Sequence, residues 1–511
     1  MVKVFIKNMN RFVKLFIIIL LLGNSVFSYA QEKDTLALAK EWNDLGKFHK
    51  ASSILSEYYS NHPQDLYAGW LYALSLHQSG RFAKSQKIYD HLTKSFSTNN
   101  DLKLDRINKL GETGRLNKAI DQIEIEEASF PLSYQQELLK TKAKIFYWQG
   151  DYDEAFKNVK AFLKITPRDV EALSLKRKIE LARKAWLNID FIYFGDDQPL
   201  TRSAPSLRYQ HYLNSNFTVG AYVDLFFYNY ESKSEVTNWI KATTTYRSFK
   251  GNFIVKGEIG NVYYSAGNNN EITGLLSVTK GIIPRLSLTA YTERSPYLAT
   301  TFSVNNKLMM NQSGVSLDWN DNKGFMGRLS YDLSMFSEIN NSYYTISGWL
   351  VSPSLKYSNL SLRLGYGYNF STSEENTFVS KYDLDYIEAN WTEDYKIEGV
   401  YDPFFSPKNQ QVHSVIGLIS YKPNNRINLG FDMGYGFIGQ ADSPVLYLNK
   451  NAEGKTYIDR DFYRISYHPL FINTFFSYRF TDKLDVKVFY KYQETFYYQS
   501  NLLGISSRII F

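Results

Sequence analysis

The chain has 511 residues, of which 16% are aromatic, and a formal net charge of +7. A mean hydropathy of −0.35 excludes a domain built of many membrane-spanning helices, and a charge this small and diffuse gives no argument for nucleic acid as a partner. The chain has no Cys, which excludes disulfides, thiolate metal sites and cysteine nucleophiles.

The first 30 residues match the pattern of a secretory signal peptide. Basic residues between Lys3 and Lys14 precede an apolar run at 15–22, and the tripeptide 28–30 supplies a small-x-small cleavage motif. The apolar run is too short for the roughly 20 residues that a membrane-spanning helix needs. The sequence therefore predicts secretion with cleavage after Ala30. Because no Cys follows, it also predicts a mature chain without a lipoprotein anchor.

A repeat begins after this segment, marked by four glycines spaced 34, 34 and 36 residues apart. A small residue follows each glycine by five positions, and in three repeats a proline comes twelve positions later. Small side chains let two helices approach closely, glycine allows the turn between them, and proline ends the second helix. The pattern predicts four helix pairs. Its signature positions are Gly46, Gly80, Gly114 and Gly150 for the turns and Pro63, Pro131 and Pro167 for the pair boundaries.

This pattern resembles the tetratricopeptide repeat, which implies an α-helical solenoid over residues 31–185. The third repeat departs from the usual pattern at Ile107, and a polar-faced helix caps the end. In such repeats the first helix of each pair lines a concave groove. Glu137, Lys140 and Lys144 are therefore candidates for binding a periplasmic protein partner. The alternative is a spacer that needs no ligand.

From Trp186 onward the apolar period changes to two. Alternation along 362–370, 427–437 and 484–492 puts large apolar residues on one face and Gly or charged residues on the other. Segments of about ten residues suit a bilayer crossing, and Tyr near their ends suits an aromatic girdle. Residues 186–511 therefore predict an all-β transmembrane antiparallel barrel of about 16 strands rather than a soluble sandwich. The candidate lumen residues are Arg363, Asp432, Asp485, Lys487, Phe489 and Lys491.

The last predicted strand ends on Phe511. Apolar residues at alternate positions, Ile505, Ile509 and Phe511, resemble the signal by which the barrel assembly machinery recognises outer membrane proteins, although Ser507 departs from it. A barrel loses its open edges only if the last strand pairs with the first. The resemblance implies a barrel in bacterial outer membrane lipid. An even strand number then puts the helical domain in the periplasm.

The sequence carries no recognisable catalytic motif. His211, His413 and His468 have no companion Ser or Asp at a familiar spacing, and each is expected in a loop or on the polar wall. There is no phosphate-binding loop, nucleophile elbow, zinc-protease motif or dinucleotide fingerprint. Acidic clusters are more typical of solvated loops than of metal sites. We therefore expect no enzymatic activity, no metal and no cofactor.

The segment "GVYDPFFSPKNQQVHSVIGLISY" (399–421) carries a second resemblance. Pro403 and Pro407 cannot lie within a strand ladder, so a loop is expected before the strand that begins near Val412. The FFSPK core is similar to a Tyr-Phe/Tyr-Ser-Pro-Gln stretch in the barrel of the outer membrane component of cellulose synthase. The order of signal peptide, repeats and barrel also resembles the exporters of cellulose and of poly-N-acetylglucosamine, although these usually have many more than four repeats.

The resemblance implies a non-enzymatic porin through which an exopolysaccharide leaves the cell, with the repeats holding periplasmic partners. Phe489 is the inward-facing aromatic candidate for stacking on sugars. The YaiO family of outer membrane barrels, often fused to similar repeats, is another resemblance, and it implies no established activity. It leaves a closed barrel that anchors a periplasmic scaffold as the second hypothesis. A barrel enzyme acting on lipid or glycan is the third.

Overall fold

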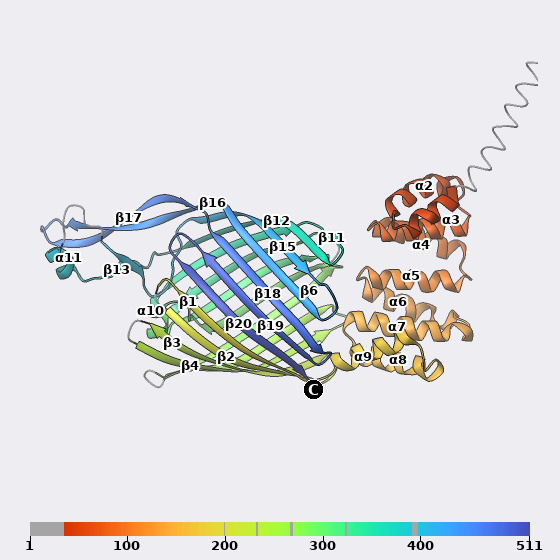
Figure 1. Cartoon of the computed structure of the whole chain (residues 1–511), viewed down its shortest axis with the longest axis horizontal. Coiled ribbons are helices and arrows are strands. Elements are labelled where there is room, and N and C mark those ends of the chain that lie inside the picture. The colour runs from red at the N-terminus through yellow and green to blue at the C-terminus, as the bar shows by residue number, and fades with distance from the viewer. Residues whose placement is uncertain (1–34, 199, 231–232, 266–268, 322–323, 391–396) are drawn as a thin grey trace, which may run out of the picture. The chain divides into compact units, whose positions relative to one another are not determined.

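The computed structural model describes residues 35–198, 200–230, 233–265, 269–321, 324–390 and 397–511. The predicted signal peptide lies outside the described residues. Contacts divide these described residues into two compact units, one formed by those up to 150 together with 154–176, and the other by those in 151–153 and 177–511. The predicted fold class, a helical solenoid followed by a barrel of about 16 strands, is confirmed (Figure 1).

The helical part consists of consecutive antiparallel helices joined by short turns (Figure 1). Residues 35–44 form the first described helix. Two short 3₁₀ segments, η1 (Glu127–Ser129) and η2 (Leu132–Tyr134), lengthen the connection around Pro131. The helices that follow residues 35–44 are α2 (Phe48–Asn61), α3 (Leu66–Gln78), α4 (Phe82–Ser95), α5 (Asn100–Glu112), α6 (Leu116–Glu126), α7 (Gln135–Gln149), α8 (Tyr152–Ile165) and α9 (Val170–Ala182).

The turn inside each helix pair uses a left-handed glycine. The φ angle is +71° at Gly46, +81° at Gly80, +76° at Gly114 and +85° at Gly150. Other L-residues pay about 1–2 kcal/mol in this region, so the periodic glycines have a conformational cause. The alanines five positions after three of these glycines are fully buried, which lets the paired helices approach closely.

The connections between pairs contain the predicted prolines. Pro63 and Pro167 lie in turns and Pro131 lies just before η2, so all three are outside helix interiors. The third repeat keeps its helices although Ile107 replaces a small residue, because Ile107 is only 1% exposed and packs in the core with Leu104, Leu110 and Ile145. No helix in the described ranges has the length and hydropathy needed to cross a bilayer.

Within the described residues, sixteen antiparallel strands close into one barrel. Each strand pairs with the next around the ring, and β20 returns to β1. The ring, in order, is β1 (Trp186–Asp196), β2 (Leu200–Tyr212), β3 (Phe217–Tyr230), β4 (Lys233–Ser248), β5 (Phe253–Tyr264), β6 (Asn269–Ile283), β7 (Leu286–Pro296), β8 (Met309–Asn320), β9 (Met326–Phe336), β10 (Asn341–Val351), β12 (Leu360–Ser373), β15 (Gln410–Tyr421), β16 (Ile427–Lys450), β18 (Leu470–Thr481), β19 (Leu484–Glu494) and β20 (Gln499–Ile510).

The closing seam between β1 and β20 is continuous. Its register runs from Trp186 opposite Ile510 to Asp196 opposite Ser500. The backbone N–H of Phe511 then donates to the carbonyl of Ala185 at 3.0 Å. The seam therefore satisfies the backbone groups of the first and last strands, as a membrane barrel requires.

The barrel wall has one apolar and one polar face. On β1, Ile189, Phe191 and Tyr193 are 44–48% exposed and face the membrane side of the wall. The alternate residues Asn188 and Asp190 belong to the inward face, and Asp190 is only 9% exposed. Residues that lie opposite each other on paired strands share a face of the wall. The pairing register therefore extends the inward and outward assignment from β1 to every other strand of the ring.

The two ends of the barrel differ in the length of their connections. At the loop end, long connections at 297–308 and 374–409 contain α10 (Thr301–Asn305), β13 (Phe378–Ser380), α11 (Leu384–Asn390) and β14 (Gly399–Tyr401). At the turn end, connections such as 249–252 and 422–426 are short. β11 (Leu355–Tyr357) lies at the turn end, and η3 (Ser337–Ile339) joins β9 to β10 at the loop end.

A hairpin projects beyond the barrel at the loop end (Figure 1). The second half of β16 leaves the ring and pairs with β17 (Thr456–Tyr467). Ile387 of α11 and Ile397 pack on Leu446 of β16, which gives the projection a small apolar core of its own. The strands extend beyond the length that a bilayer crossing needs because they support this projection.

Candidate functional site: the lumen wall and its covered end

β19 carries an inward-facing row of charged and aromatic side chains. Lys487, Phe489 and Lys491 alternate with outward-facing Val488 and Tyr490, which are 41% and 37% exposed. The Nζ of Lys487 lies 5.5 Å from the centre of the Phe489 ring, and that of Lys491 lies 5.9 Å from it. Both lysines are exposed, so the row presents ammonium groups and one aromatic ring to the water of the lumen.

Glycines on neighbouring strands leave room for two aromatic rings of this wall, those of Phe489 and Phe475. A Cβ added to Gly504 would lie 2.3 Å from Cζ of Phe489, and one added to Gly430 would lie 2.1 Å from Cε1 of Phe475. Each ring therefore lies against bare backbone of the next strand. Lys487 reaches across to Phe475 as well, at 4.5 Å from its centre. The rings and lysines form one packed row across β18 (Leu470–Thr481) and β19.

The barrel seam adds a pocket to this wall at the turn end. It encloses about 340 Å³, within the range of roughly 300–1,000 Å³ typical of small-molecule sites. Trp186 and Asn188 come from β1, Ser506 and Arg508 from β20, and Lys487 from β19. The guanidinium of Arg508 lies 4.9 Å from the Trp186 ring. The pocket thus combines an aromatic face, hydroxyl and amide groups, two cations and the carboxylate of Asp485.

Charges elsewhere on the inward face are mostly neutralised in place. On the wall formed by β3 to β5, Lys241 lies 3.3 Å from Asp224, and Lys256 lies 2.6 Å from Glu258. Lys241 also covers the Trp239 ring at 3.6 Å. Asp224 is only 6% exposed, so this wall keeps its ion pairs partly out of water.

The wall opposite β19 is acidic. β7 is seventh in the ring and β19 is fifteenth, so they lie half a turn of the barrel apart. Glu293 of β7 and Asp332 of β9 belong to the inward register there. Asp332 accepts hydrogen bonds from the Tyr291 hydroxyl at 2.6 Å and from Ser330 at 3.1 Å. The lumen is therefore polarised across its width, with acids facing the β19 lysines.

The structure places all six predicted lumen residues on the inward face but brings only some of them together. Lys487, Phe489 and Lys491 form the row described above, and Asp485 lies beside them in an ion pair with Arg479 at 3.0 Å. The other two have different surroundings: Arg363 donates to the carbonyls of Gly324 and Ser352 at the turn end, and Asp432 accepts from Asn473. Trp186 was missed because only the seam register joins β1 to β20, and Arg508 was missed because its contact is with the Trp186 ring across that seam.

The connection at 297–308 folds into the loop end of the barrel. Val304 of α10 is fully buried against Leu200 and Tyr228, which are inward-facing residues of β2 and β3. Leu298 packs beside them and also reaches Val262 on β5. A capping box between Thr300 and Ser303 fixes the start of α10. This connection leaves the ring between β7 and β8 and covers the ends of β2 to β5.

The segment 399–407 covers another sector of the same end. Phe404 is fully buried, stacks on Phe336 of β9 with ring centres 4.0 Å apart, and contacts Tyr343 of β10. The next ring, Phe405, stacks on Tyr497 in the connection between β19 and β20, with centres 3.6 Å apart. Adjacent residues thus contact opposite sectors of the rim. The predicted Pro-bounded loop lies across the mouth of the barrel.

Hydrogen bonds tie the two coverings to each other and to the loop end. The Thr300 hydroxyl donates to the carbonyl of Pro403 at 2.8 Å. Fully buried Ser406 accepts from the Thr377 N–H at 2.7 Å. Arg460 of the projecting hairpin donates to the carbonyls of Asn376 and Phe378, at 2.6 and 2.9 Å. The cover at the loop end is therefore a packed, hydrogen-bonded structure.

The histidines lie away from this site. His413 is on the outward face of β15, with Nδ1 2.6 Å from the Tyr366 hydroxyl. His211 is beside outward-facing Tyr209 on β2, and His468 contacts the carbonyl of Gly436. The expectation of a loop or polar-wall position is wrong for His211 and His413, because their strand parity follows the exposed aromatic residues. Within the described residues, no group of three His, Asp or Glu side chains could hold a metal ion.

Known proteins of similar structure share little sequence with this chain. No protein family matches its sequence, and no curated protein is similar to it at a significant level. Among solved structures, a bacterial polysaccharide outer membrane secretin is similar over 64% of this chain and 99% of its own, with 11% identity and a TM-score of 0.46. The outer membrane protein opdK of Pseudomonas aeruginosa covers the same shares with 9% identity and a TM-score of 0.33. A tetratricopeptide repeat protein from Parabacteroides merdae covers 30% of this chain and 58% of its own, with 15% identity and a TM-score of 0.27.

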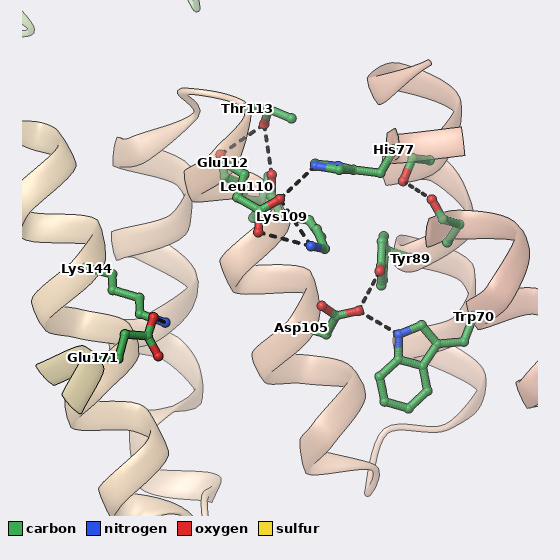
Figure 2. Close-up of polar contacts among 12 residues, drawn as sticks. Trp70, His77, Tyr89, Asp105, Lys109, Leu110, Glu112, Thr113, Lys144 and Glu171 are labelled. Carbon is green, nitrogen blue, oxygen red and sulfur yellow. Dashed lines mark hydrogen bonds and ion pairs between the residues drawn. The ribbon is translucent and has the colours of Figure 1, made fainter. Parts of the chain in front are cut away.

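In the helical unit, two of the three predicted groove residues are engaged by α9. Lys140 forms ion pairs with Asp169 at 3.0 Å and Glu171 at 2.9 Å. Lys144 reaches Glu171 at 2.6 Å (Figure 2). These pairs join α7 to the start of the last helix. Glu137 is exposed in the first turn of α7. The lysines therefore hold the end of the solenoid together, and of the three residues only Glu137 is without a partner among the interactions found in the described residues.

A polar network joins the second repeat to the third (Figure 2). One oxygen of the Asp105 carboxylate accepts from the Trp70 indole N–H and from the Tyr89 hydroxyl, both at 2.6 Å. Tyr89 is fully buried, and burial together with the Asp105 charge raises the pKa of Tyr89 far above its usual range. The hydroxyl therefore stays a hydrogen-bond donor at every physiological pH.

A second charged group joins the same two repeats. Glu112 at the end of α5 lies 2.9 Å from Nε2 of His77 and 3.0 Å from Nζ of Lys109 (Figure 2). Burial raises the pKa of Glu112, but the hydrogen bonds from His77 and Lys109 outweigh burial and lower it to about 2. The carboxylate is therefore held ionised between the two repeats.

Proposed function

We propose that this chain is a non-enzymatic outer membrane porin that exports an exopolysaccharide, with its helical unit in the periplasm. One observation carries the proposal: the inward row of lysines and aromatic rings on β18 and β19, which lines a barrel wide enough for an aqueous lumen. Aromatic rings offer a face to the apolar side of a sugar ring, and the polar groups beside them offer hydrogen bonds.

The cover at the loop end acts as a gate in this proposal. It is made of two connections rather than of a separate domain, and loops move on faster timescales than the strands that carry them. A polymer that enters from the turn end meets the pocket first, then the row on β19, and last the aromatic contacts of Phe404 and Phe405. The cover explains how a wide barrel could avoid leaking small solutes at rest.

The experiment is single-channel recording of the full chain in planar bilayers, with oligosaccharides added on one side. We expect rare openings, and a polymer that enters the lumen should block the open current. A control uses the variant Lys450→Gln, which removes a charge from the projecting hairpin and should leave the block unchanged. If the openings are insensitive to every glycan tested, the export proposal is wrong.

A second candidate function is a closed barrel that anchors a periplasmic scaffold. The full burial of Phe404 and Ser406 favours it, because a packed cover resembles a structural core more than a mobile lid. The helical unit would then supply the activity by binding a protein, and exposed Glu137 is one of its available groups. Electrical silence that persists after the cover is weakened would support this candidate.

A further inference from the structure

We propose that the β18–β20 wall binds an acidic polysaccharide, whose anionic groups pair with Lys487, Lys491 and Arg508. This inference rests on the proposed export function and specifies its substrate class. The three cations belong to the inward register of β19 and β20. They share the wall with the Phe475 and Phe489 rings.

Unlike several other cations of the lumen, these three have no acidic partner among the described residues. Lys241, Lys256 and Arg328 each form an ion pair with a carboxylate of the barrel, at 3.3, 2.6 and 2.6 Å. Among the described residues, Lys487, Lys491 and Arg508 form no ion pair. The only contacts found for them are with aromatic rings. A cation held against a ring keeps most of its hydrogen-bonding capacity for an outside anion.

Three acidic groups near this wall already have polar partners. Asp485 is paired with Arg479 at 3.0 Å, and Asp432 accepts from the Asn473 amide at 2.9 Å. Asp190 of β1 accepts from the Asn188 amide at 3.2 Å. They therefore do not neutralise the three cations. The wall keeps a net positive character while its neighbours are balanced.

The positions of the groups suit a chain-like ligand. Lys487 and Lys491 are four residues apart on one strand, which at roughly 3.3 Å per residue separates their Cα atoms by about 13 Å. Phe489 lies between them. Arg508 and the pocket with Trp186 continue the row to the turn end. An acidic polymer could thus place an anionic group at each cation and a sugar ring on the phenyl group between them.

The opposite wall adds a steering effect. Glu293 faces the lysines from half a turn of the ring away, and Asp332 lies on β9, six strands from β19. An anionic polymer is repelled there and attracted to β19, so it would follow one side of the lumen. A neutral polymer gains nothing from this polarity, and a cationic one would be drawn to the other wall.

The test is isothermal titration of the purified full-length protein in detergent with three hexasaccharides: oligogalacturonate, maltohexaose and chitosan hexamer. We expect oligogalacturonate to bind at least tenfold more tightly than maltohexaose, with an affinity that falls as salt is added. Lys487→Gln/Lys491→Gln should lower that affinity at least tenfold. The matched control, Lys256→Gln/Arg328→Gln, removes two inward cations that already have acidic partners, and should lower it less than threefold.

Separate outcomes overturn the two proposals. If maltohexaose or the chitosan hexamer binds better than oligogalacturonate, the acidic substrate class is wrong and glycan export stands. If the control variant loses as much affinity as Lys487→Gln/Lys491→Gln, the assignment of the wall is wrong. If none of the three binds and none blocks the open channel, the export proposal falls as well. The single variant Arg508→Gln gives a second reading in case the double variant inserts poorly.

Discussion

Phe405 and Tyr497 stack with their ring centres 3.6 Å apart and their planes inclined by only 9°. Phe405 belongs to the connection between β12 and β15, and Tyr497 to the connection between β19 and β20. The neighbouring ring, Phe404, is fully buried against Phe336 of β9. Two adjacent side chains therefore bind one connection to both sides of the rim, and this contact closes the loop end.

Weakening these stacks should open the barrel. Replacing a buried Phe by Ala costs about 3–5 kcal/mol in a packed site. If the closed state loses about 3 kcal/mol relative to the open one, the ratio of open to closed channels rises roughly 100-fold. We expect Phe404→Ala/Phe405→Ala to raise the ratio of open to closed time in single-channel recordings by about this factor.

The control for the gate is Tyr463→Ala, which removes an exposed aromatic residue from β17 on the projecting hairpin. It should leave the open probability unchanged, because Tyr463 is 47% exposed and lies outside the cover. A double variant at Phe404 and Phe405 that inserts normally and opens no more often than the wild type would show that this cover does not gate the lumen.

The ionised Glu112 should make the helical unit sensitive to acid. Its folded pKa of about 2 lies below the ordinary value of 4.5. A lowered carboxyl pKa contributes stability that is fully present above pH 4.5 and is lost as the pH falls toward 2. We expect Glu112→Gln to lower the thermal midpoint of the helical signal at pH 7 but not at pH 2, as followed by circular dichroism at 222 nm.

Glu124→Gln is the matched control for this titration. Glu124 is an exposed residue of α6, so its substitution should not move the midpoint at either pH. An equal loss of stability for Glu112→Gln at pH 7 and at pH 2 would contradict the role assigned to the ionised carboxylate between His77 and Lys109.

Most of the fold could be predicted from sequence patterns that repeat with a fixed period. The 34-residue glycine period predicts the helix pairs because each left-handed turn needs glycine. The two-residue period predicts the faces of the wall, so Lys487, Phe489 and Lys491 could be placed inward before their neighbours were known. Both patterns come from local geometry, which repeats wherever the backbone repeats.

The covered end and the seam pocket could not be predicted in this way. Phe404 and Phe405 lie in a loop without a period, and their partners Phe336 and Tyr497 belong to distant parts of the chain. The seam places Arg508 beside Trp186 through a register that no local pattern sets. Long-range packing decides these contacts, and the sequence shows only that aromatic residues are available.

The Asp105 carboxylate should be a major stabilising group of the solenoid. Asp105→Ala leaves the buried Tyr89 hydroxyl and the Trp70 indole N–H without their acceptor. Unsatisfied buried donors cost about 1–3 kcal/mol each, so we expect a loss of roughly 2–4 kcal/mol in unfolding free energy. Urea unfolding followed at 222 nm measures it, and the helical signal should be lost at lower urea while the barrel stays folded.

Asp121→Ala serves as the control for Asp105, because Asp121 is an exposed residue of α6 and surface substitutions usually change stability by less than about 0.5 kcal/mol. Asp105→Asn gives an intermediate case, since its amide oxygen can still accept a hydrogen bond from one of the two donors. If Asp105→Ala unfolds at the same urea concentration as Asp121→Ala, the link between the second and third repeats is not carried by this carboxylate.

The packing of the Phe489 ring against Gly504 can be tested by adding a single methyl group at Gly504. A Cβ at Gly504 would lie 2.3 Å from Phe489 Cζ, so the ring must leave its position, whereas a Cβ at Gly417 meets no atom within 4 Å. Overpacking of this kind costs about 1–3 kcal/mol. We expect Gly504→Ala, but not Gly417→Ala, to lower the urea midpoint of the barrel in lipid vesicles.

A double-mutant cycle separates this contact from a general intolerance of Ala at Gly504. In the background of Phe489→Ala the clashing ring is gone, so Gly504→Ala should then cost almost nothing. The difference between the two backgrounds measures the coupling between Phe489 and Gly504. If Gly504→Ala costs the same with and without the ring, the glycine is needed for its backbone rather than for the ring. The inward row of β19 would then have to be held in place by contacts other than this one.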